Sequence, residues 1–360
     1  MIPQTLRKEE RISFALRELY ENYGYRRYKM SKFEEYDFYV RNKESLISDG
    51  VITFTDTTGK LMALKPDVTL SIIKNAREGE GVQKVYYNEN VYRVSPTAHC
   101  FKEIAQMGLE CMGNIDAVCI YEVIRLAMDS LCVVDSDAVL DISHLGLLSE
   151  LLTDLPKETR GEICRLLSQK NAHELRSFCQ KAKLDEALTD KLCALTALYG
   201  TPTEVLAKLV TLVSPDSAAL EELKNLCALF EGSEMLRIDP AMTDDMNYYG
   251  GFVFKGFIKG VPEHVLSGGQ YDKLVRRMGK AKGAVGFALY LDRLERVGET
   301  ETPPDADIVL LYDDTADIAA LTAAANELRQ QGSVLVLQQL PQGKRFGRIL
   351  YFTNGEVKEK

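Results

Sequence analysis

The 360-residue sequence contains no tryptophan and no apolar run that approaches the ~20 residues of a membrane-spanning helix. Its N-terminus enters a charged amphipathic pattern at once, without the apolar core and small-residue cleavage site of a signal peptide. These absences argue against membrane insertion and secretion. We therefore expect a cytoplasmic protein.

Residue patterns for metal, redox and nucleotide chemistry are also missing. The eight cysteines form no CxxC or CxH pair, the four histidines show no HxxxH spacing, and Walker and GxGxxG loops are lacking. Asp135, Asp137 and Asp141 flank an apolar strand, as turn residues do. We expect core cysteines, no metal site and no cofactor. A net charge of −9 argues weakly against nucleic-acid binding, because phosphate contacts need clustered Lys and Arg.

Hydrophobic periodicity indicates the architecture. Residues 7–23 fit a helix, and residues 51–54, 60–64, 82–94 and 101–112 resemble strands joined by hairpin turns. Residues 147–236 read as helix, and strand patterns return after residue 245. Paired prolines mark a linker, and a β-α-β-β pattern follows. We expect an α+β fold with an antiparallel sheet flanked by helices.

These signals divide the chain into five segments. A core begins at residues 1–146, is interrupted by a helical insertion at 147–236 and is completed at 237–297. A linker at 298–305 leads to a small α/β domain at 306–360, whose size suggests that it docks on something.

The second arm of the hairpin at residues 82–112 carries polar side chains on one face. Because side chains alternate along a strand, Gln106, Gly108 and Glu110 share a face opposite Met107, Leu109 and Cys111. A glycine between two polar residues leaves room for a small ligand. A solvated face explains the same pattern, so both interpretations stay open.

Asp67 and Thr69 stand where a helix N-cap belongs, after a strand and a proline. Capping accounts for them, and so does a pocket in which Asp67 and Glu110 together compensate an ammonium group. Residues 246–254 add paired tyrosines and paired glycines. On a strand, one of Tyr248 and Tyr249 would face the core and the other a pocket. Residues 283–293 run from a small-residue strand into a helix that presents Arg293.

In this order, the segments resemble the catalytic core of class II aminoacyl-tRNA synthetases, in particular the histidyl branch, over about residues 3–297. Residues 90–113 resemble the motif 2 hairpin, and residues 285–293 resemble motif 3. Residues 64–69 (LKPDVT) resemble the histidyl Arg-Pro-Glu-Gly-Thr loop, and residues 247–249 with 268–272 resemble the histidine-binding segments. The likeness implies the class II fold.

The departures from the synthetases fall on activation. Asp244 stands where they carry an arginine that assists amino-acid activation, and reversing that charge should remove transition-state stabilisation. Ser95 replaces a nucleotide-contacting glutamate, Gln270 replaces an arginine, and Ser31 stands at the proline of motif 1. Arg93 is retained.

Residues that match the amino-acid pocket are kept: Asp67, Thr69, Gln106, Glu110, Tyr249 and Tyr271. Retained binding without activation resembles the regulatory subunits of ATP phosphoribosyltransferase, which are synthetase paralogues in histidine biosynthesis. The resemblance implies no catalysis, L-histidine as ligand, and a vestigial nucleotide site at Arg93 and Arg293. In this interpretation Asp67, Thr69 and Gln106 hold the α-ammonium, while Glu110, Tyr249 and Tyr271 contact the imidazole.

The same resemblance implies allosteric control of a separate short catalytic subunit, and a homodimer within a hetero-oligomer. The C-terminal unit resembles a reduced anticodon-binding domain with few basic residues, so a tRNA partner is not expected. A histidyl-tRNA synthetase and a degenerate ATP-dependent amino-acid ligase remain the alternatives.

Overall fold

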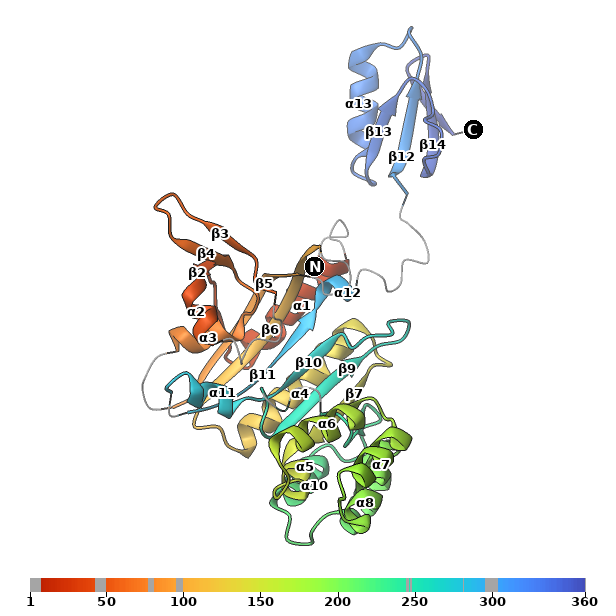
Figure 1. Ribbon diagram of the computed structural model, residues 1–360. Coiled ribbons are helices and arrows are strands. Elements are labelled where there is room, and N and C mark those ends of the chain that lie inside the picture. Colours follow the sequence, from red (N-terminus) through yellow and green to blue (C-terminus); the bar gives the residue numbers. More distant parts are fainter. Residues whose placement is uncertain are drawn as a thin grey trace. The chain divides into compact units, whose positions relative to one another are not determined.

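The computed structural model describes residues 8–42, 50–76, 81–94, 100–243, 246, 248–280, 282–294 and 304–359. The chain forms two compact units, Met1–Val297 and Gly298–Lys360 (Figure 1). The larger unit contains the central sheet and a group of helices, and the smaller unit has a sheet of its own. Among the described residues, no helix is both long enough and apolar enough to span a bilayer.

An eight-stranded sheet organises the larger unit, in the order β1-β5-β6-β11-β10-β9-β7-β8. Neighbouring strands from β5 to β7 are antiparallel, and the two outermost pairs are parallel. Strands that precede and strands that follow the helical insertion in sequence join in this one sheet. Its antiparallel central pairs confirm the predicted α+β fold with an antiparallel sheet. The strands are β1 (Arg26–Arg27), β5 (Gln83–Val94), β6 (Phe101–Gly113), β7 (Val139–His144), β8 (Leu236–Ile238), β9 (Phe252–Phe257), β10 (Leu266–Gln270) and β11 (Gly283–Tyr290).

Two helices cover one face of this sheet. In α1 (Lys8–Asn22) the buried residues Ile12, Leu16 and Tyr20 recur at helical spacing and join the same core cluster as α4 (Ala117–Val134). The Tyr20 hydroxyl lies 3.0 Å from Ser130 Oγ, so this buried polar group has a partner on the second helix. Burial of each large apolar side chain contributes about 1.5–3 kcal/mol. The opposite face of the sheet is left for other elements.

A second, three-stranded sheet lies on that opposite side, in the order β2-β4-β3. Its strands are β2 (Phe33–Glu35), β3 (Thr53–Thr55) and β4 (Leu61–Leu64), and the short helices α2 (Tyr36–Arg41) and α3 (Thr69–Asn75) accompany them. The strand expected at residues 51–54 corresponds to β3, which begins and ends later in the chain. Asp56 closes the β3–β4 turn, because its carboxylate accepts hydrogen bonds from the backbone of Thr58 and Lys60.

The helical insertion packs its own leucine-rich core against β7 and β8, within the main hydrophobic cluster. Side-chain caps begin most of its helices, including a full capping box between Thr201 and Glu204. The helices are α5 (Leu145–Leu151), α6 (Lys157–Ser168), α7 (Ala172–Lys181), α8 (Glu186–Thr196), α9 (Pro202–Leu212) and α10 (Ala218–Ala228).

The smaller unit contains one helix on a four-stranded sheet of order β13-β12-β14-β15. Strands β12 (Ala306–Tyr312), β13 (Val334–Leu337) and β14 (Phe346–Thr353) are parallel, and β15 (Glu356–Glu359) is antiparallel. Helix α13 (Ile318–Leu328) buries Leu321 against Ile308, Leu310 and Phe352. The β-α-β-β pattern of the sequence thus folds as one layer of helix on one layer of sheet.

Candidate ligand-binding pocket

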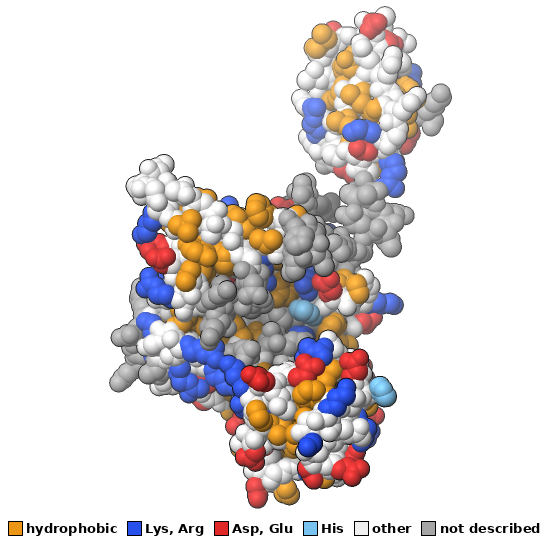
Figure 2. All heavy atoms as spheres, viewed as in Figure 1, with side chains coloured by type: hydrophobic (Ala, Val, Ile, Leu, Met, Phe, Trp, Pro, Cys, Tyr) orange, Lys and Arg blue, Asp and Glu red, His pale blue; other side chains and the backbone are white. Residues whose placement is uncertain are grey.

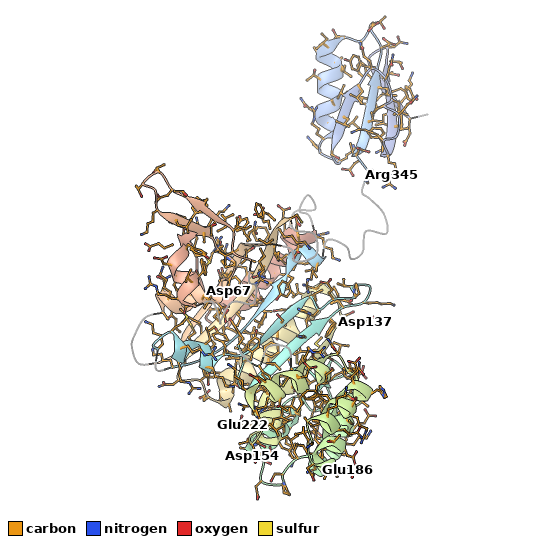
Figure 3. All side chains as sticks on the ribbon, viewed as in Figure 1. Asp67, Asp137, Asp154, Glu186, Glu222 and Arg345 are labelled. Carbon is orange, nitrogen blue, oxygen red and sulfur yellow. The ribbon has the colours of Figure 1, made fainter. Side chains whose placement is uncertain are left out.

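A polar pocket lies on the face of the central sheet opposite α4, beside the start of α3. All six residues predicted to contact an amino acid line it, together with Arg93. Figure 3 shows Asp67 between the small sheet and the central sheet. The complete lining is Asp67, Val68, Thr69, Tyr87, Arg93, Gln106, Glu110, Tyr248, Tyr249, Ser267, Tyr271, Gly286, Phe287, Ala288 and Tyr290.

Asp67 precedes Val68, the N-cap of α3, but still accepts a hydrogen bond from the first turn and lines the pocket, so the two interpretations of the sequence are compatible. Its Oδ1 accepts a hydrogen bond from the backbone N–H of Leu70 at 2.8 Å, at the first turn of α3. Burial raises the pKa of this carboxyl, while the Leu70 N–H and the nearby Arg93 cation oppose that shift. Asp67 is therefore a buried acid with only partial compensation.

Glu110 is the second buried acid, with 2% of its surface exposed. Thr69 donates its hydroxyl to Oε1 at 2.6 Å, and the Tyr271 hydroxyl donates to Oε2. Burial raises the pKa of Glu110 from 4.5 to about 8, the charge of Asp67 adds to the rise, and the two hydroxyl donors oppose it. Glu110 is thus largely protonated at neutral pH in the empty pocket.

The polar face of β6 is therefore not solvated, because Gln106 is only 4% exposed. The alternation predicted for β6 does hold, since Met107, Leu109 and Cys111 belong to the apolar core on the other face. Gly108 does not leave empty space, which corrects the ligand interpretation of that glycine. A Cβ there would lie 2.6 Å from the Tyr87 hydroxyl and 2.2 Å from the Phe287 carbonyl oxygen.

Gly286 on β11 provides the room for Glu110. A Cβ at this position would lie 1.8 Å from Glu110 Oε2 and 2.5 Å from the carbonyl oxygen of Leu109. The register explains the closeness, since Gly286 pairs directly with Glu110 across the two strands. The carboxyl group therefore lies over the sheet only because its cross-strand neighbour lacks a side chain.

The tyrosine pair differs from the expectation. Tyr248 and Tyr249 lie in a turn rather than a strand, so they do not alternate between core and pocket. Both line the pocket, with ring centroids 4.7 Å apart, and Tyr248 also contacts the ring of Tyr271. Burial raises the pKa values of Tyr248 and Tyr271 well above the usual range, so their hydroxyls remain protonated donors.

Four polar lining residues are absent from the set predicted from the sequence: Tyr87, Tyr248, Ser267 and Tyr290. Tyr87 could have been found from alternation along β5, because it pairs with Gly108. Ser267 and Tyr290 face each other across β10 and β11, with their hydroxyl oxygens 2.9 Å apart. No motif marks that pair, since only the strand register brings it to the pocket.

Little space remains inside the empty pocket. The side chains leave about 30 Å³, which is room for roughly one water molecule. An amino acid can enter only if pocket side chains move. A ligand that hydrogen-bonds to Glu110 would compete with its present contacts to Thr69 and Tyr271.

The two arginines assigned to a vestigial nucleotide site are placed differently. Arg93 lines the pocket and donates its Nε–H to the carbonyl oxygen of Pro66 at 2.9 Å. Arg293, on α12 (Leu291–Leu294), is not among the lining residues and donates to the His264 carbonyl oxygen. It also forms an ion pair with Glu263 at 3.2 Å and stacks on Tyr290. A nucleotide site therefore stays a prediction.

The positions that depart from the synthetase motifs are only partly visible. Asp244 and Ser95 lie outside the described residues. Gln270 is structural, since its Oε1 accepts a hydrogen bond from the Phe252 N–H at 2.9 Å. Ser31 accepts a hydrogen bond from the Phe33 N–H at 3.1 Å.

Comparison with known proteins places the chain in a family. A model described as "Histidyl-tRNA synthetase" matches residues 1–294. Proteins named ATP phosphoribosyltransferase regulatory subunit are 27% identical in Oceanobacillus iheyensis and 29% in Caldanaerobacter subterraneus; each match covers 93% of this chain, and 86% and 91% of the relative. A histidine–tRNA ligase of Methanocaldococcus jannaschii is 26% identical over 98% of this chain and 87% of its own.

The same fold occurs in solved structures. A protein of Bacillus halodurans described as an ATP phosphoribosyltransferase regulatory subunit/histidyl-tRNA synthetase superposes with a TM-score of 0.76 at 22% identity, covering 97% of this chain and 96% of that one. A histidyl-tRNA synthetase of Nostoc gives 0.71 at 19% identity, covering 93% and 83%. With a class II synthetase-like fold and a family match over most of its length, the chain belongs to the histidyl-tRNA synthetase family and is related within it to the ATP phosphoribosyltransferase regulatory subunits.

Proposed function

We propose that this chain is a non-catalytic regulatory subunit of ATP phosphoribosyltransferase, and that it binds free L-histidine in the pocket beside α3. Relatives with that name cover nearly the whole chain. The observation that carries the ligand assignment is the pair of buried acids, Asp67 and Glu110, in one pocket. Buried carboxyls call for a cationic or hydrogen-bonding ligand.

The two ends of histidine match different parts of the pocket. Asp67 is an acceptor for the α-ammonium group, with Thr69 and Gln106 beside it. Glu110 follows Gln106 on β6. As a protonated acid, it donates a hydrogen bond to a neutral imidazole nitrogen. Tyr271 and Tyr249 supply aromatic faces and hydroxyls around the ring. Arg93 is the cation available for the ligand carboxylate.

Without a ligand, the pocket is nearly filled by its own side chains, and this supports a regulatory role. Because only about 30 Å³ is free, histidine binding needs a movement of pocket side chains, and a ligand that contacts Glu110 competes with Thr69 and Tyr271 for it. A ligand shifts an equilibrium by its differential affinity for two states, and couplings of about 1–3 kcal/mol are usual. Tyr271 directly follows β10 and precedes α11, so in this proposal its displacement reaches both elements.

The partner in this proposal is a separate short catalytic subunit in a hetero-oligomer, with this chain as a homodimer within it. A solved Thermotoga maritima structure described as an ATP phosphoribosyl transferase (HisG:HisZ) complex contains a similar fold, with a TM-score of 0.63 at 18% identity. That likeness concerns the fold. The partner is proposed from the names of the relatives.

Calorimetric histidine titration and histidine-dependent ATP–pyrophosphate exchange, on the same preparation, test the proposal. We expect saturable histidine binding that is lost in Asp67→Asn, and no exchange. Robust exchange would overturn the non-catalytic assignment in favour of a synthetase or a ligase. Absence of histidine binding in a folded preparation would overturn the ligand assignment. Restored activity of a short catalytic subunit on addition of this chain, changed by histidine, tests the partner.

A further inference from the structure

A second cavity lies between the helical insertion and the core and shares no lining residue with the histidine pocket. Its volume is about 470 Å³, within the range of about 300–1,000 Å³ that small-molecule sites occupy. Helix α6 forms one wall, and α11 (Asp272–Arg277) contributes Lys273 from the other side. The lining is Ser149, Leu152, Lys157, Arg160, Gly161, Cys164, Arg165, Ser168, Thr243, Met246 and Lys273.

The charged side chains among the described lining residues of this cavity are all cationic. Four of its lining residues are cationic, and none of the described lining residues is acidic, in a chain whose net charge is −9. Arg165 is paired with Glu162 at 2.6 Å. Within the described parts of the chain, Lys157, Arg160 and Lys273 form no ion pair. Figure 2 shows Lys and Arg side chains gathered over the α11 region, above the helical insertion.

The neutral part of the lining completes an anion-binding surface. Helix α6 begins at Lys157 after Pro156, which provides no side-chain cap for the N–H groups of the first turn. Ser149 and Ser168 add hydroxyl groups to the wall. Gly161 lines the cavity beside open space, because a Cβ built there meets no atom within 4 Å.

We propose that this cavity binds a small ligand that carries two or more phosphate groups. Three cations that have no carboxylate partner among the described residues match several negative charges, and the concave shape encloses a small molecule. A long nucleic acid is disfavoured, because Glu158 and Glu162 on the same helix would repel a phosphate backbone that extends along α6. The proposal does not depend on histidine binding.

Calorimetric titration of the full chain with inorganic pyrophosphate tests this site. Arg160→Gln and Lys273→Gln should each weaken binding by about tenfold, as expected for loss of one charge-assisted hydrogen bond. Lys181→Gln, at the exposed end of α7, removes one cation outside the cavity and should change the dissociation constant by less than about twofold.

A volume test separates a cavity site from general attraction to positive charge. Gly161→Leu places a large side chain in the open space of the cavity wall without changing the charge, and should abolish pyrophosphate binding while histidine binding and melting temperature are retained. Binding that persists in Gly161→Leu, or that weakens equally in Lys181→Gln, would overturn the proposal. So would saturable binding of a single-stranded oligoribonucleotide by a chain that does not bind pyrophosphate.

Discussion

Glu110 determines how histidine binding should depend on pH. With a pKa of about 8, the acid is protonated at neutral pH, and in the proposed complex it donates to a neutral imidazole nitrogen. Above pH 8 it loses this proton, and the wild-type affinity should fall about tenfold for each further pH unit, which corresponds to about 1.4 kcal/mol. Below the imidazole pKa of about 6.5, binding must expel the ligand's extra proton, so affinity falls there too.

Glu110→Gln isolates the contribution of this one proton. Glutamine is a neutral donor of similar shape at every pH, so its binding of neutral imidazole needs no acid proton. The ionisation of the ligand is common to both proteins and cancels in the ratio of their dissociation constants. The dissociation constant of the wild type divided by that of Glu110→Gln should be constant between pH 6 and 7.5 and about tenfold higher at pH 9. Calorimetric titrations at four pH values measure it.

The same pKa shift makes a stability prediction without any ligand. The folded-state pKa lies above the unfolded value, so the stabilising contribution is complete below pH 4.5 and is lost as pH rises to about 8. Relative to Glu110→Gln, the wild type should therefore lose up to about 5 kcal/mol of unfolding free energy across this range. Urea denaturation at pH 5 and pH 9 tests it. A pH-independent difference, together with a constant affinity ratio, would refute the buried neutral acid.

Three further substitutions test the structure around the pocket. Gly286→Ala should abolish histidine binding and destabilise the fold by about 1–3 kcal/mol or more, because its Cβ meets the Glu110 carboxyl, and calorimetry with thermal melting checks both effects. Glu89→Gln should cost about 3 kcal/mol by leaving the fully buried Lys65 unpaired, with a smaller loss at pH 10 than at pH 7, as denaturation at the two pH values would show. Leu16→Ala should cost about 2–5 kcal/mol in urea denaturation yet keep histidine affinity unchanged, which controls for general destabilisation.

The sequence predicts the pocket residues better than it predicts their environment. Alternation along β6 correctly separates Gln106 and Glu110 from Met107 and Leu109, because a strand has a fixed period of two. Alternation does not show whether the polar face is solvated. That depends on α3 and the tyrosine turn, which come from distant segments and cover β6 only in the folded chain.

Register is the information that the sequence lacks most. Gly286 stands opposite Glu110, and Tyr290 opposite Gln106, because β11 pairs with β6 across more than 170 residues of chain. Neither glycine nor tyrosine carries a local signal of that pairing. For Tyr248 and Tyr249 a local signal was present but wrong. Their β-favouring composition suggests a strand, whereas the chain forms a turn there.

Glu110 links the fold to the proposed regulation. A carboxyl over the middle of a central sheet is destabilising when ionised, and Thr69 and Tyr271 only partly compensate it. A ligand that supplies a better partner for Glu110 therefore binds more tightly, because it relieves the burial cost that the empty pocket retains. Because Tyr271 begins the segment that leads into α11, its release from Glu110 would be transmitted to that helix. A buried acid whose two hydroxyl partners only partly offset its desolvation thus gives a physical origin for ligand-driven rearrangement. Replacing it with glutamine should weaken the response of a partner subunit more than it weakens binding.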